Sequence, residues 1–370
     1  MSSLRTVDVV FTDGRAYTIT IGDGILSDIK ISHGSHASHA VVITEHQIAA
    51  LGHTGPLQCT VENLRSRGMR VDVVTFEGGE QRKNLTTVMD ILQQLYAIPG
   101  IDRQTLLVAV GGGVVGDIVG FVASIYLRGL PFLQIPTTLL AMVDSSVGGK
   151  TGVDFEQGKN LVGAFIQPTA VWVDTSMLAS LPKRELIAGM AEVIKYGIIN
   201  DPTILDLCQT LPAETNGYID IVSRSCRIKA HVVVDDELEL SGARATLNFG
   251  HTIGHALEGL TGYSRYKHGE AVAIGMVAAC HIGVAAGITP PSILNTLLDT
   301  LLSIRLPVEL PNDISDDDLI ALTSRDKKAA AGIAKYVLAR DYGNLELHRL
   351  NVDVIRQGLA THRMSGRNHV

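Results

Sequence analysis

The sequence predicts an α/β fold in two parts: an N-terminal domain with a mainly parallel, Rossmann-like sheet over residues 1–178, and an all-α C-terminal domain over residues 179–370. The chain has 370 residues, which is more than one hydrophobic core usually supports. In the first half, short segments rich in valine and isoleucine alternate with helix-like segments, as in a parallel sheet covered by helices. After about residue 180 the strand-like segments stop, and helix-like segments follow.

The elements can be assigned in chain order. The first residues, MSSLRTVDVVFTDG, lack a charged region followed by an apolar one, so we expect a strand there and no signal peptide. Further strands are predicted at 40–45, 71–78, 105–112, 132–136 and 170–174. Apolar residues at helical spacing predict helices at 85–98, 183–199, 219–236, 247–260, 270–287 and 292–304. The domains would join near 175–182, with the active site expected between them.

Composition excludes several classes of protein. The chain is 46% hydrophobic and 19% charged with a net charge of −7, which is typical of a soluble globular protein. Lys and Arg total 31 against 38 acidic residues without a basic run, so we expect no nucleic-acid partner, although a cleft could still attract an anionic small molecule. The four cysteines are scattered, which predicts neither disulfides nor a thiolate metal site, and favours a cytoplasmic protein.

Two apolar segments are long enough to raise the question of a membrane. Residues 105–127 contain five glycines and Asp117, and residues 271–288 contain His281 and are followed by two prolines. Buried strand–turn–helix and core-helix structures explain these segments better than membrane spans. We therefore expect no membrane association.

A glycine-rich turn follows one of the predicted strands, in VAVGGGVVGDIVGF at 108–121. Glycines there would let the backbone approach a pyrophosphate at a helix N-terminus. Gly111, Gly113 and Gly116 have the GxGxxG spacing, which alone is a weak signal, and a tight turn between buried elements would need glycines too. The turn alone leaves nucleotide binding and a purely structural role equally open. The polar segment 77–84, taken alone, is interpreted as a solvated turn.

The segment 135–165 is rich in polar side chains between apolar anchors. We interpret it as a long loop, and loops of this length within compact domains are usually functional. Lysine and asparagine together suit a phosphate, as a point charge and a hydrogen-bond donor. The alternative is an ordinary exposed loop.

Three histidines lie close together in the segment 248–275. His251 and His255 share one face of a predicted helix, and His268 begins the next helix. HTIGH lacks the glutamate of HExxH, which disfavours a zincin-type protease. Glu192, in an apolar helix, is the best acidic candidate for a third metal ligand, although an ion pair with Lys195 is the structural alternative. The pattern favours a metal site over hydrogen-bonded core histidines.

Several motifs, in order, give the chain a recognisable pattern: GGGVVGD, LRG, IPTTLLAMVDSSVGGKTGVD, GKNLVGAF, AEVIKYG, LNFGHTIGHALE and HGEAVAIGM. Over nearly its whole length the chain closely resembles the 3-dehydroquinate synthase family of the sugar phosphate cyclases. The resemblance implies a homodimeric, NAD-dependent lyase with one divalent metal, zinc or alternatively cobalt. Its sugar-acid phosphate substrate, 3-deoxy-D-arabino-heptulosonate 7-phosphate, would be cyclised to 3-dehydroquinate of the shikimate pathway with loss of phosphate. NAD would take and return a hydride.

The resemblance also assigns roles to residues of this chain. The implied metal ligands are Glu192, His251 and His268. The implied NAD contacts are Glu80, Lys83, Gly112, Gly113, Val114, Asp117, Thr137, Thr138, Asp144, Lys159, Ser180 and Glu185. The implied substrate and catalytic residues are Lys150, Asn160, Lys195, Lys229, Glu239, Arg244, Asn248, His255 and Lys327, with Arg128 reaching the phosphate of the neighbouring subunit.

The chain departs from the family pattern in one segment. DELELSGARATLN carries one extra residue before Arg244, so Glu239 fits the family glutamate best while Glu237 stays an alternative. Near the C-terminus, Lys328 and Lys335 are alternatives to Lys327.

Three other functions are compatible with parts of the pattern. Related cyclases make valiolones or deoxy-inososes from substrates without a carboxylate, whereas Arg244, Asn248 and Lys229 favour a carboxylate-bearing one. Metal-dependent alcohol or glycerol dehydrogenases share a GGG…D turn but do not need the phosphate-binding stretch. A non-enzymatic NAD-binding regulator would not need the three metal ligands.

Overall fold

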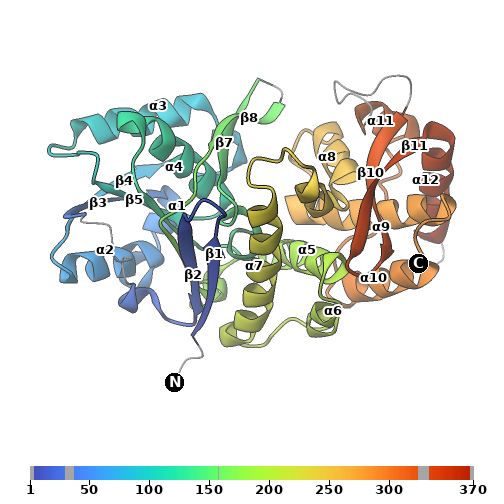
Figure 1. The fold of residues 1–370 in the computed structure, drawn as a ribbon, viewed down its shortest axis with the longest axis horizontal. Helices are drawn as coiled ribbons and strands as arrows, with labels where there is room; N and C mark the ends of the chain where they lie inside the picture. The colour runs from blue at the N-terminus through green and yellow to red at the C-terminus, as the bar shows by residue number, and fades with distance from the viewer. Residues whose placement is uncertain (1–3, 30–36, 157, 324–332, 367–370) are drawn as a thin grey trace. The chain divides into compact units, whose positions relative to one another are not determined.

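The computed structural model describes residues 4–29, 37–156, 158–323 and 333–366, which form two compact units (Figure 1). The first unit is Met1–Leu181 with Ala213–Leu238, and the second is Pro182–Pro212 with Glu239–Val370. The predicted division, 1–178 and 179–370, assigned the segment 213–238 to the C-terminal domain. Its helix α7 (Tyr218–Asp235) instead packs against β1 (Arg5–Val10) and β2 (Ala16–Gly22) of the first unit.

The first unit is built on a seven-stranded sheet of order β1-β2-β9-β6-β5-β3-β4. β1 pairs antiparallel with β2, and the remaining pairs are parallel. The other strands are β3 (His39–Glu45), β4 (Arg70–Phe76), β5 (Leu106–Gly111), β6 (Phe132–Pro136) and β9 (Ala170–Asp174). The predicted mainly parallel α/β fold is therefore confirmed.

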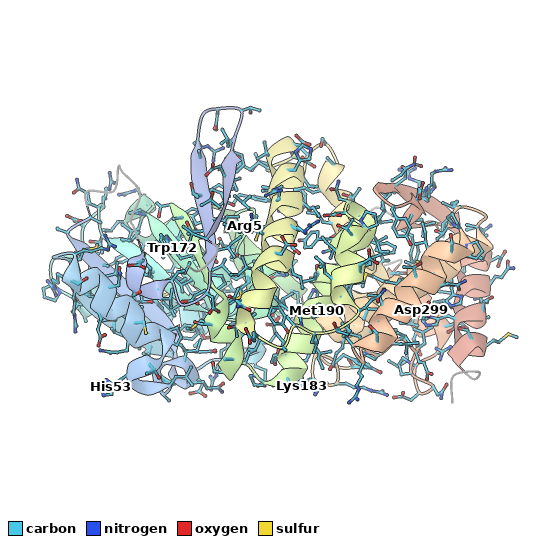
Figure 2. All side chains as sticks on the ribbon, turned by 90° about the horizontal axis from the view of Figure 1, so that it is seen from below. Arg5, His53, Trp172, Lys183, Met190 and Asp299 are labelled. Carbon is cyan, nitrogen blue, oxygen red and sulfur yellow. The ribbon has the colours of Figure 1, made fainter. Side chains whose placement is uncertain are left out.

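Helices cover both faces of this sheet because successive side chains of a buried strand point to opposite sides. Val41 and Ile43 pack in one apolar layer with α3 (Leu85–Ala97) and α4 (Gly113–Ile125). Ala40 and Val42 pack in the other layer with α2 (Pro56–Ser66). Trp172 of β9, labelled in Figure 2, also belongs to this second layer and is 6% exposed. The continuous apolar runs of these strands are what burial on two faces requires.

Short elements complete the first unit. They are η1 (Leu26–Asp28), α1 (His46–Ala49), η2 (Gly52–Thr54), η3 (Glu80–Arg82), η4 (Tyr126–Arg128), the π-helix η5 (Ala141–Ser145), η6 (Thr175–Ser180) and η7 (Thr215–Gly217). Single-turn π-helices are rare and occur mostly at functional sites.

The segment 135–165 is more regular than the predicted loop. After η5 it forms an antiparallel hairpin of β7 (Lys150–Phe155) and β8 (Gly158–Phe165). Glycines bring the two strands unusually close, since a Cβ added at Gly163 would lie 2.2 Å from the Thr151 carbonyl oxygen. Glycine-rich composition suggests a loop in the sequence, but here it serves close strand packing.

The second unit is mainly helical. Its helices are α5 (Lys183–Ile199), α6 (Thr203–Cys208), η8 (Ala243–Asn248), α8 (His251–Leu260), α9 (His268–Ala285), α10 (Pro291–Ser303), α11 (Asp316–Thr323) and α12 (Val352–Gly366). The expectation of an all-α domain missed a two-stranded antiparallel sheet, β10 (Ile333–Asp341) and β11 (Asn344–Asn351). These strands pack against helices, and β10 contacts α9.

Helix α9 forms the centre of the second unit and packs against α5, α8, α10 and α12. By length and composition it could span a membrane, yet 83% of its apolar window is buried inside the protein, as in a core helix. Glycines allow its neighbours to approach closely. A Cβ at Gly275 would lie 2.0 Å from the Gly250 carbonyl oxygen of the α8 N-terminus, and one at Gly269 would lie 1.8 Å from the Ala188 carbonyl oxygen of α5.

Candidate metal and nucleotide sites

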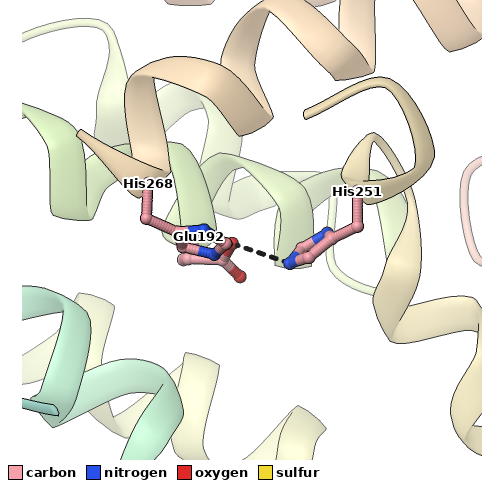
Figure 3. A group of neighbouring side chains, drawn as sticks. All are labelled: Glu192, His251 and His268. Atoms are coloured by element: carbon pink, nitrogen blue, oxygen red, sulfur yellow. Dashed lines mark ion pairs between the residues drawn. The ribbon is translucent and has the colours of Figure 1, made fainter. Parts of the chain in front are cut away.

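Three side chains from three helices meet in the second unit (Figure 3). Glu192 comes from the middle of α5, His251 begins α8 and His268 begins α9. Their ligand atoms all lie within 4.8 Å of one another. The structure thus brings together the three residues that the sequence nominated as metal ligands.

The local backbone explains how two helix starts converge on Glu192. Gly250 precedes α8 with φ of +81°, a conformation that glycine adopts without steric cost. A side chain at Gly250 would also meet Met276 of α9 at 2.5 Å. The contact of Gly269 with α5 places the first turn of α9 beside Glu192 in the same way.

The two imidazoles face the carboxylate with the same ring nitrogen. Nε2 of His251 lies 3.5 Å and Nε2 of His268 3.7 Å from Oε1 of Glu192. The opposite nitrogens have acceptors of their own: Nδ1 of His251 lies 3.2 Å from the Phe249 carbonyl oxygen, and Nδ1 of His268 lies 3.4 Å from Oε2 of Glu258. Both Nε2 atoms are therefore directed toward the shared space.

The electrostatics of this cluster suit a cation. Glu192 is completely buried and forms an ion pair with Lys195, and within the described residues neither of its oxygens receives a hydrogen bond of acceptable geometry. Burial, and then the nearby charges of Lys195, His268 and His255, hold the pKa of His251 well below its usual range. A neutral imidazole is the form that binds metal, and two imidazoles with one carboxylate are a ligand set typical of catalytic zinc. The residues therefore fit a divalent metal ion.

His255, one turn along α8 from His251, completes a triangle of imidazoles. Its ring centroid lies 5.3 Å from that of His251 and 5.9 Å from that of His268. The side chain is exposed, as a substrate-facing residue would be. With Glu258 and His268 it forms a second group whose ligand atoms lie within 4.8 Å. Sequence analysis missed Glu258, whose signal was its position seven residues after His251 on the same helix face.

The other nominated residues of the second unit differ in exposure. Lys195 is 1% exposed and Arg244 is 2% exposed, whereas Asn248 is exposed. Arg244 and Asn248 both lie in η8, which packs against α5. Glu239 is exposed with φ of +59°, and Lys335 is exposed on β10. Lys327 and Lys328 lie outside the described residues.

In the first unit, the glycine-rich turn lies at the carboxyl end of β5, where α4 begins with Gly113 and Val114. The turn adjoins the segment after β6: the Thr137 N–H donates to the Gly111 carbonyl oxygen at 2.9 Å, and a Cβ at Gly112 would approach the Thr138 methyl group to 3.1 Å. Carboxyl ends of parallel strands, with the N–H groups of a helix start, form the usual place for a dinucleotide phosphate.

Lys83 connects two of the other nominated residues. Its Nζ lies 2.5 Å from Oδ2 of Asp117 in α4 and 2.6 Å from Oδ1 of Asn160 in β8. Burial alone would lower its pKa, but the charge and hydrogen bond of Asp117 outweigh burial and raise the pKa of Lys83 above its usual value. Lys83 is 6% exposed, so the interpretation of 77–84 as a solvated turn is wrong at this residue, although Glu80 is exposed.

A second lysine of the first unit anchors the π-helix. Nζ of Lys229 in α7 lies 2.9 Å from Oδ1 of Asp144 and donates to the Asp144 carbonyl oxygen at 2.7 Å. Of the remaining nominated residues, Lys159 has its Nζ 3.2 Å from Oε1 of Glu80, and Lys150, Arg128 and Ser180 are exposed. Glu185, of the second unit, pairs with Lys267 at 2.6 Å.

The chain matches two sequence models of one protein family in succession. The sequence model described as 3-dehydroquinate synthase N-terminal matches residues 73–188, and the one described as 3-dehydroquinate synthase C-terminal matches residues 189–329. The chain is 41% identical to a 3-dehydroquinate synthase of Desulforamulus reducens, over 90% of this chain and 94% of that protein. It is 43% identical to a 3-dehydroquinate synthase of Rhodospirillum rubrum, over 94% of this chain and 91% of that protein.

Among solved structures, the fold is similar to that of a 2-deoxy-scyllo-inosose synthase complexed with carbaglucose-6-phosphate, NAD+ and Co2+. The TM-score is 0.84 at 26% sequence identity, and the match covers 97% of this chain and 100% of that chain.

Proposed function

Because the chain belongs to the 3-dehydroquinate synthase family, we propose that it converts 3-deoxy-D-arabino-heptulosonate 7-phosphate to 3-dehydroquinate with elimination of phosphate, as a lyase of the shikimate pathway in the cytoplasm. The observation that carries this proposal is the meeting of Glu192, His251 and His268 from three helices, in a chain that matches a relative of this family over 94% of its length. Family membership alone would not distinguish an active enzyme from a relative that has lost its metal site.

Glu192, His251 and His268 would hold one divalent ion, with zinc as the first candidate and cobalt as the second. Such an ion, when bound, acts as a Lewis acid that polarises the hydroxyl group being oxidised. The protein contributes a completely buried carboxylate, Glu192, and an ordered orientation of both imidazoles. Lys195, paired with Glu192, would place a positive charge beside the reacting oxygen.

The first unit would bind NAD, which would supply reversible hydride transfer to the reaction. Gly112, Gly113 and Val114 would offer backbone N–H groups to the pyrophosphate. The remaining proposed contacts are Glu80, Lys83, Asp117, Thr137, Thr138, Asp144 and Lys159, with Ser180 and Glu185 on either side of the 181–182 boundary. The buried ion pair of Lys83 with Asp117 supports a fixed, preorganised binding surface.

The two charged ends of the substrate call for different side chains. Lys150, Asn160 and His255 suit the phosphate, and Lys229 and Arg244 suit the carboxylate. Asn248 and Lys327 would add contacts, and Glu239 would act near the reacting carbons. By anchoring both ends, these residues would orient the molecule for elimination and ring closure, and orientation can contribute on the order of 7 kcal/mol.

We further propose that the enzyme is a homodimer in which Arg128 reaches the neighbouring subunit's phosphate. Leu127, Arg128 and Gly129 have φ values of +50°, +68° and +126°, a costly conformation for the first two residues that is typical of functional turns. Large apolar side chains on the β7–β8 hairpin are exposed, including Phe155, Phe165 and Leu161, the last 68% exposed. Such a surface on a single chain favours association.

Two other activities predict different products. A deoxy-inosose synthase would use glucose 6-phosphate, and a valiolone synthase would use sedoheptulose 7-phosphate, neither of which carries a carboxylate. Buried Arg244 favours the carboxylate-bearing substrate, as do relatives that are more similar to this chain than the inosose synthase is. An alcohol dehydrogenase of this fold would accumulate NADH.

Phosphate release from the three sugar phosphates, with absorbance of reduced cofactor followed in parallel, tests the proposal. We expect release from the heptulosonate at least 100-fold faster than from the other two, without steady accumulation of NADH. Preference for glucose 6-phosphate or sedoheptulose 7-phosphate would reassign the chain to another cyclase. An Arg244→Met variant is expected to raise KM for the heptulosonate far more than the Kd for NAD, and equal losses would contradict the carboxylate role.

A further inference from the structure

We infer that Glu258 is a positioning residue of the metal centre: its carboxylate accepts the Nδ1 proton of His268 and so fixes the ring with Nε2 toward Glu192. The inference rests on the metal centre of the proposed function and adds to it a residue outside the ligand set. Glu258 lies in α8, one turn beyond His255, and its side chain is 4% exposed.

The geometry of the two metal-binding histidines supports this role. Each ring has one nitrogen toward Glu192 and the other toward a fixed acceptor. For His251 that acceptor is the Phe249 carbonyl oxygen, which can only accept a hydrogen bond. For His268 it is Oε2 of Glu258, at 3.4 Å. Both contacts select the tautomer with a proton on Nδ1 and a lone pair on Nε2, which is the form that binds a metal through Nε2.

The two acceptors are not equivalent, because one is neutral and the other is charged. A carboxylate polarises the ring more strongly than a peptide carbonyl does, and it increases the basicity of the opposite nitrogen. His268 also needs more support than His251, since its side chain is 30% exposed whereas that of His251 is 13% exposed. His268 is the first residue of α9, so only one side of its backbone is held by the helix. Glu258 therefore restrains the more weakly held ligand.

Burial of Glu258 has a cost that the contact with His268 explains. Carboxylates are rarely buried in an apolar environment without a partner, and α8 packs this face against α9. The nearby group of His255, Glu258 and His268 admits a second interpretation, in which these residues bind a cation of their own. We favour the positioning role because His268 would otherwise have to bridge two ions through both ring nitrogens.

Metal affinity measured without substrate or NAD tests the role directly. The variants are Glu258→Gln, which keeps a neutral acceptor, and Glu258→Ala, which removes the acceptor. Glu346→Gln is the matched control, because it removes one negative charge from an exposed carboxylate of the same unit. Dissociation constants for Zn2+ are measured by competition with a chromogenic chelator, and thermal unfolding of the metal-free proteins reports on folding.

We expect Glu258→Ala to weaken Zn2+ binding about 10- to 100-fold, Glu258→Gln to weaken it less, and Glu346→Gln to leave it unchanged. Long-range 1H–15N NMR of metal-free protein labelled at histidine should show His268 protonated on Nδ1, and this tautomer should lose population in Glu258→Ala. If Glu258→Ala does not fold, Glu258→Gln and the wild-type tautomer decide the question.

Three results would overturn the inference. The first is Zn2+ binding by both Glu258 variants within about 3-fold of wild type. The second is wild-type His268 protonated on Nε2. The third is a second equivalent of Zn2+ that is lost in Glu258→Gln, which would assign the residue to a separate cation site. Absence of Zn2+ binding in the wild type itself would instead contradict the metal centre of the proposed function.

Discussion

Arg15 and Glu237 form a bidentate ion pair, with Nη1 at 3.0 Å from Oε1 and Nη2 at 2.6 Å from Oε2. Gln167 donates a further hydrogen bond to Oε1 at 3.0 Å. Burial tends to raise the pKa of Glu237, but the hydrogen bonds from Arg15 and Gln167 outweigh it and lower the pKa below its usual value. Glu237 is thus engaged within the first unit, whereas Glu239 is exposed with a left-handed backbone. The geometry favours Glu239 as the family's functional glutamate.

Replacing Glu237 and Glu239 separately should therefore affect different quantities, stability in the first case and kcat in the second. Glu237→Gln is expected to keep kcat near the wild-type value and to cost about 1 kcal/mol or less of stability, because the Arg15 side chain is 55% exposed. Glu239→Gln is expected to lower kcat at least 10-fold with an unchanged unfolding midpoint. Steady-state phosphate release and thermal unfolding distinguish the two. A loss of kcat in Glu237→Gln but not in Glu239→Gln would make Glu237 the functional glutamate.

Gly269 controls the distance between α9 and α5. A methyl group there would lie 1.8 Å from the Ala188 carbonyl oxygen, which is backbone and cannot rotate away. Gly269→Ala must therefore displace the start of α9, and with it His268, from Glu192. We expect at least a 10-fold loss of Zn2+ affinity, measured by chelator competition, because a ligand distance must hold within tenths of an ångström.

Gly259→Ala serves as the control for this substitution. Its Cβ would meet the ends of two side chains, Leu322 at 3.0 Å and Tyr263 at 3.8 Å, and, among the described residues outside its own helix, no backbone atom within 4 Å. We expect this variant to bind Zn2+ like the wild type. Equal affinity in both variants would mean that the helix contact does not set the ligand geometry.

Lys83 is a buried cation that stabilises the half-buried carboxylate of Asp117 in the first unit. Its side chain is 7% exposed and that of Asp117 is 18% exposed. Lys83→Met should leave Asp117 without this partner and cost on the order of 3 kcal/mol of stability, with at least a 10-fold loss of NAD affinity. Lys159→Met is the comparison, since the Lys159–Glu80 pair is more exposed and should contribute less than about 1 kcal/mol. Denaturant unfolding and NAD titration measure both quantities, and equal stability losses would contradict the argument.

Much of the site was predictable because burying a charged side chain in an apolar helix costs free energy unless the side chain has a partner or a ligand. A glutamate in the apolar helix of Glu192 and two histidines on one helix face indicated a metal site before any coordinates. The parallel sheet was predictable because strands buried on both faces form continuous apolar runs.

The parts that were missed depend on long-range contacts. Nothing in the local sequence indicates that α7 packs on β1 and β2, since its apolar stripe would fit either unit. The β7–β8 hairpin was predicted as a loop because its segment is rich in glycine, but these glycines allow the two strands to pack closely. Glu258 was overlooked because its role depends on a contact with His268, ten residues away on another helix.

His281 and His362 form a stacked pair inside the second unit, with ring centroids 5.0 Å apart and planes inclined by 13°. Both are buried, and His362 donates from Nε2 to the Val308 carbonyl oxygen at 2.6 Å. Burial lowers the pKa of His281 to about 4 and, despite the hydrogen bond to Val308, that of His362 to about 3. The folded protein therefore holds both rings neutral at neutral pH.

The pair should make the second unit sensitive to acid. In the unfolded chain histidine takes up protons below about pH 6.5, whereas the folded protein takes them up only near pH 4 and below. The unfolded state binds more protons in this window, so the stability contributed by the neutral pair is complete above about pH 6.5. It is lost as the pH falls, by up to about 8 kcal/mol for the two groups together. His281→Gln should reduce the slope of unfolding free energy against pH by up to about 1.4 kcal/mol per pH unit between pH 6.5 and 4. Denaturant unfolding across this range measures the slope, with His231→Gln as the control because that side chain is 79% exposed. A slope for His281→Gln equal to that of the wild type would show that the buried pair does not govern the acid transition.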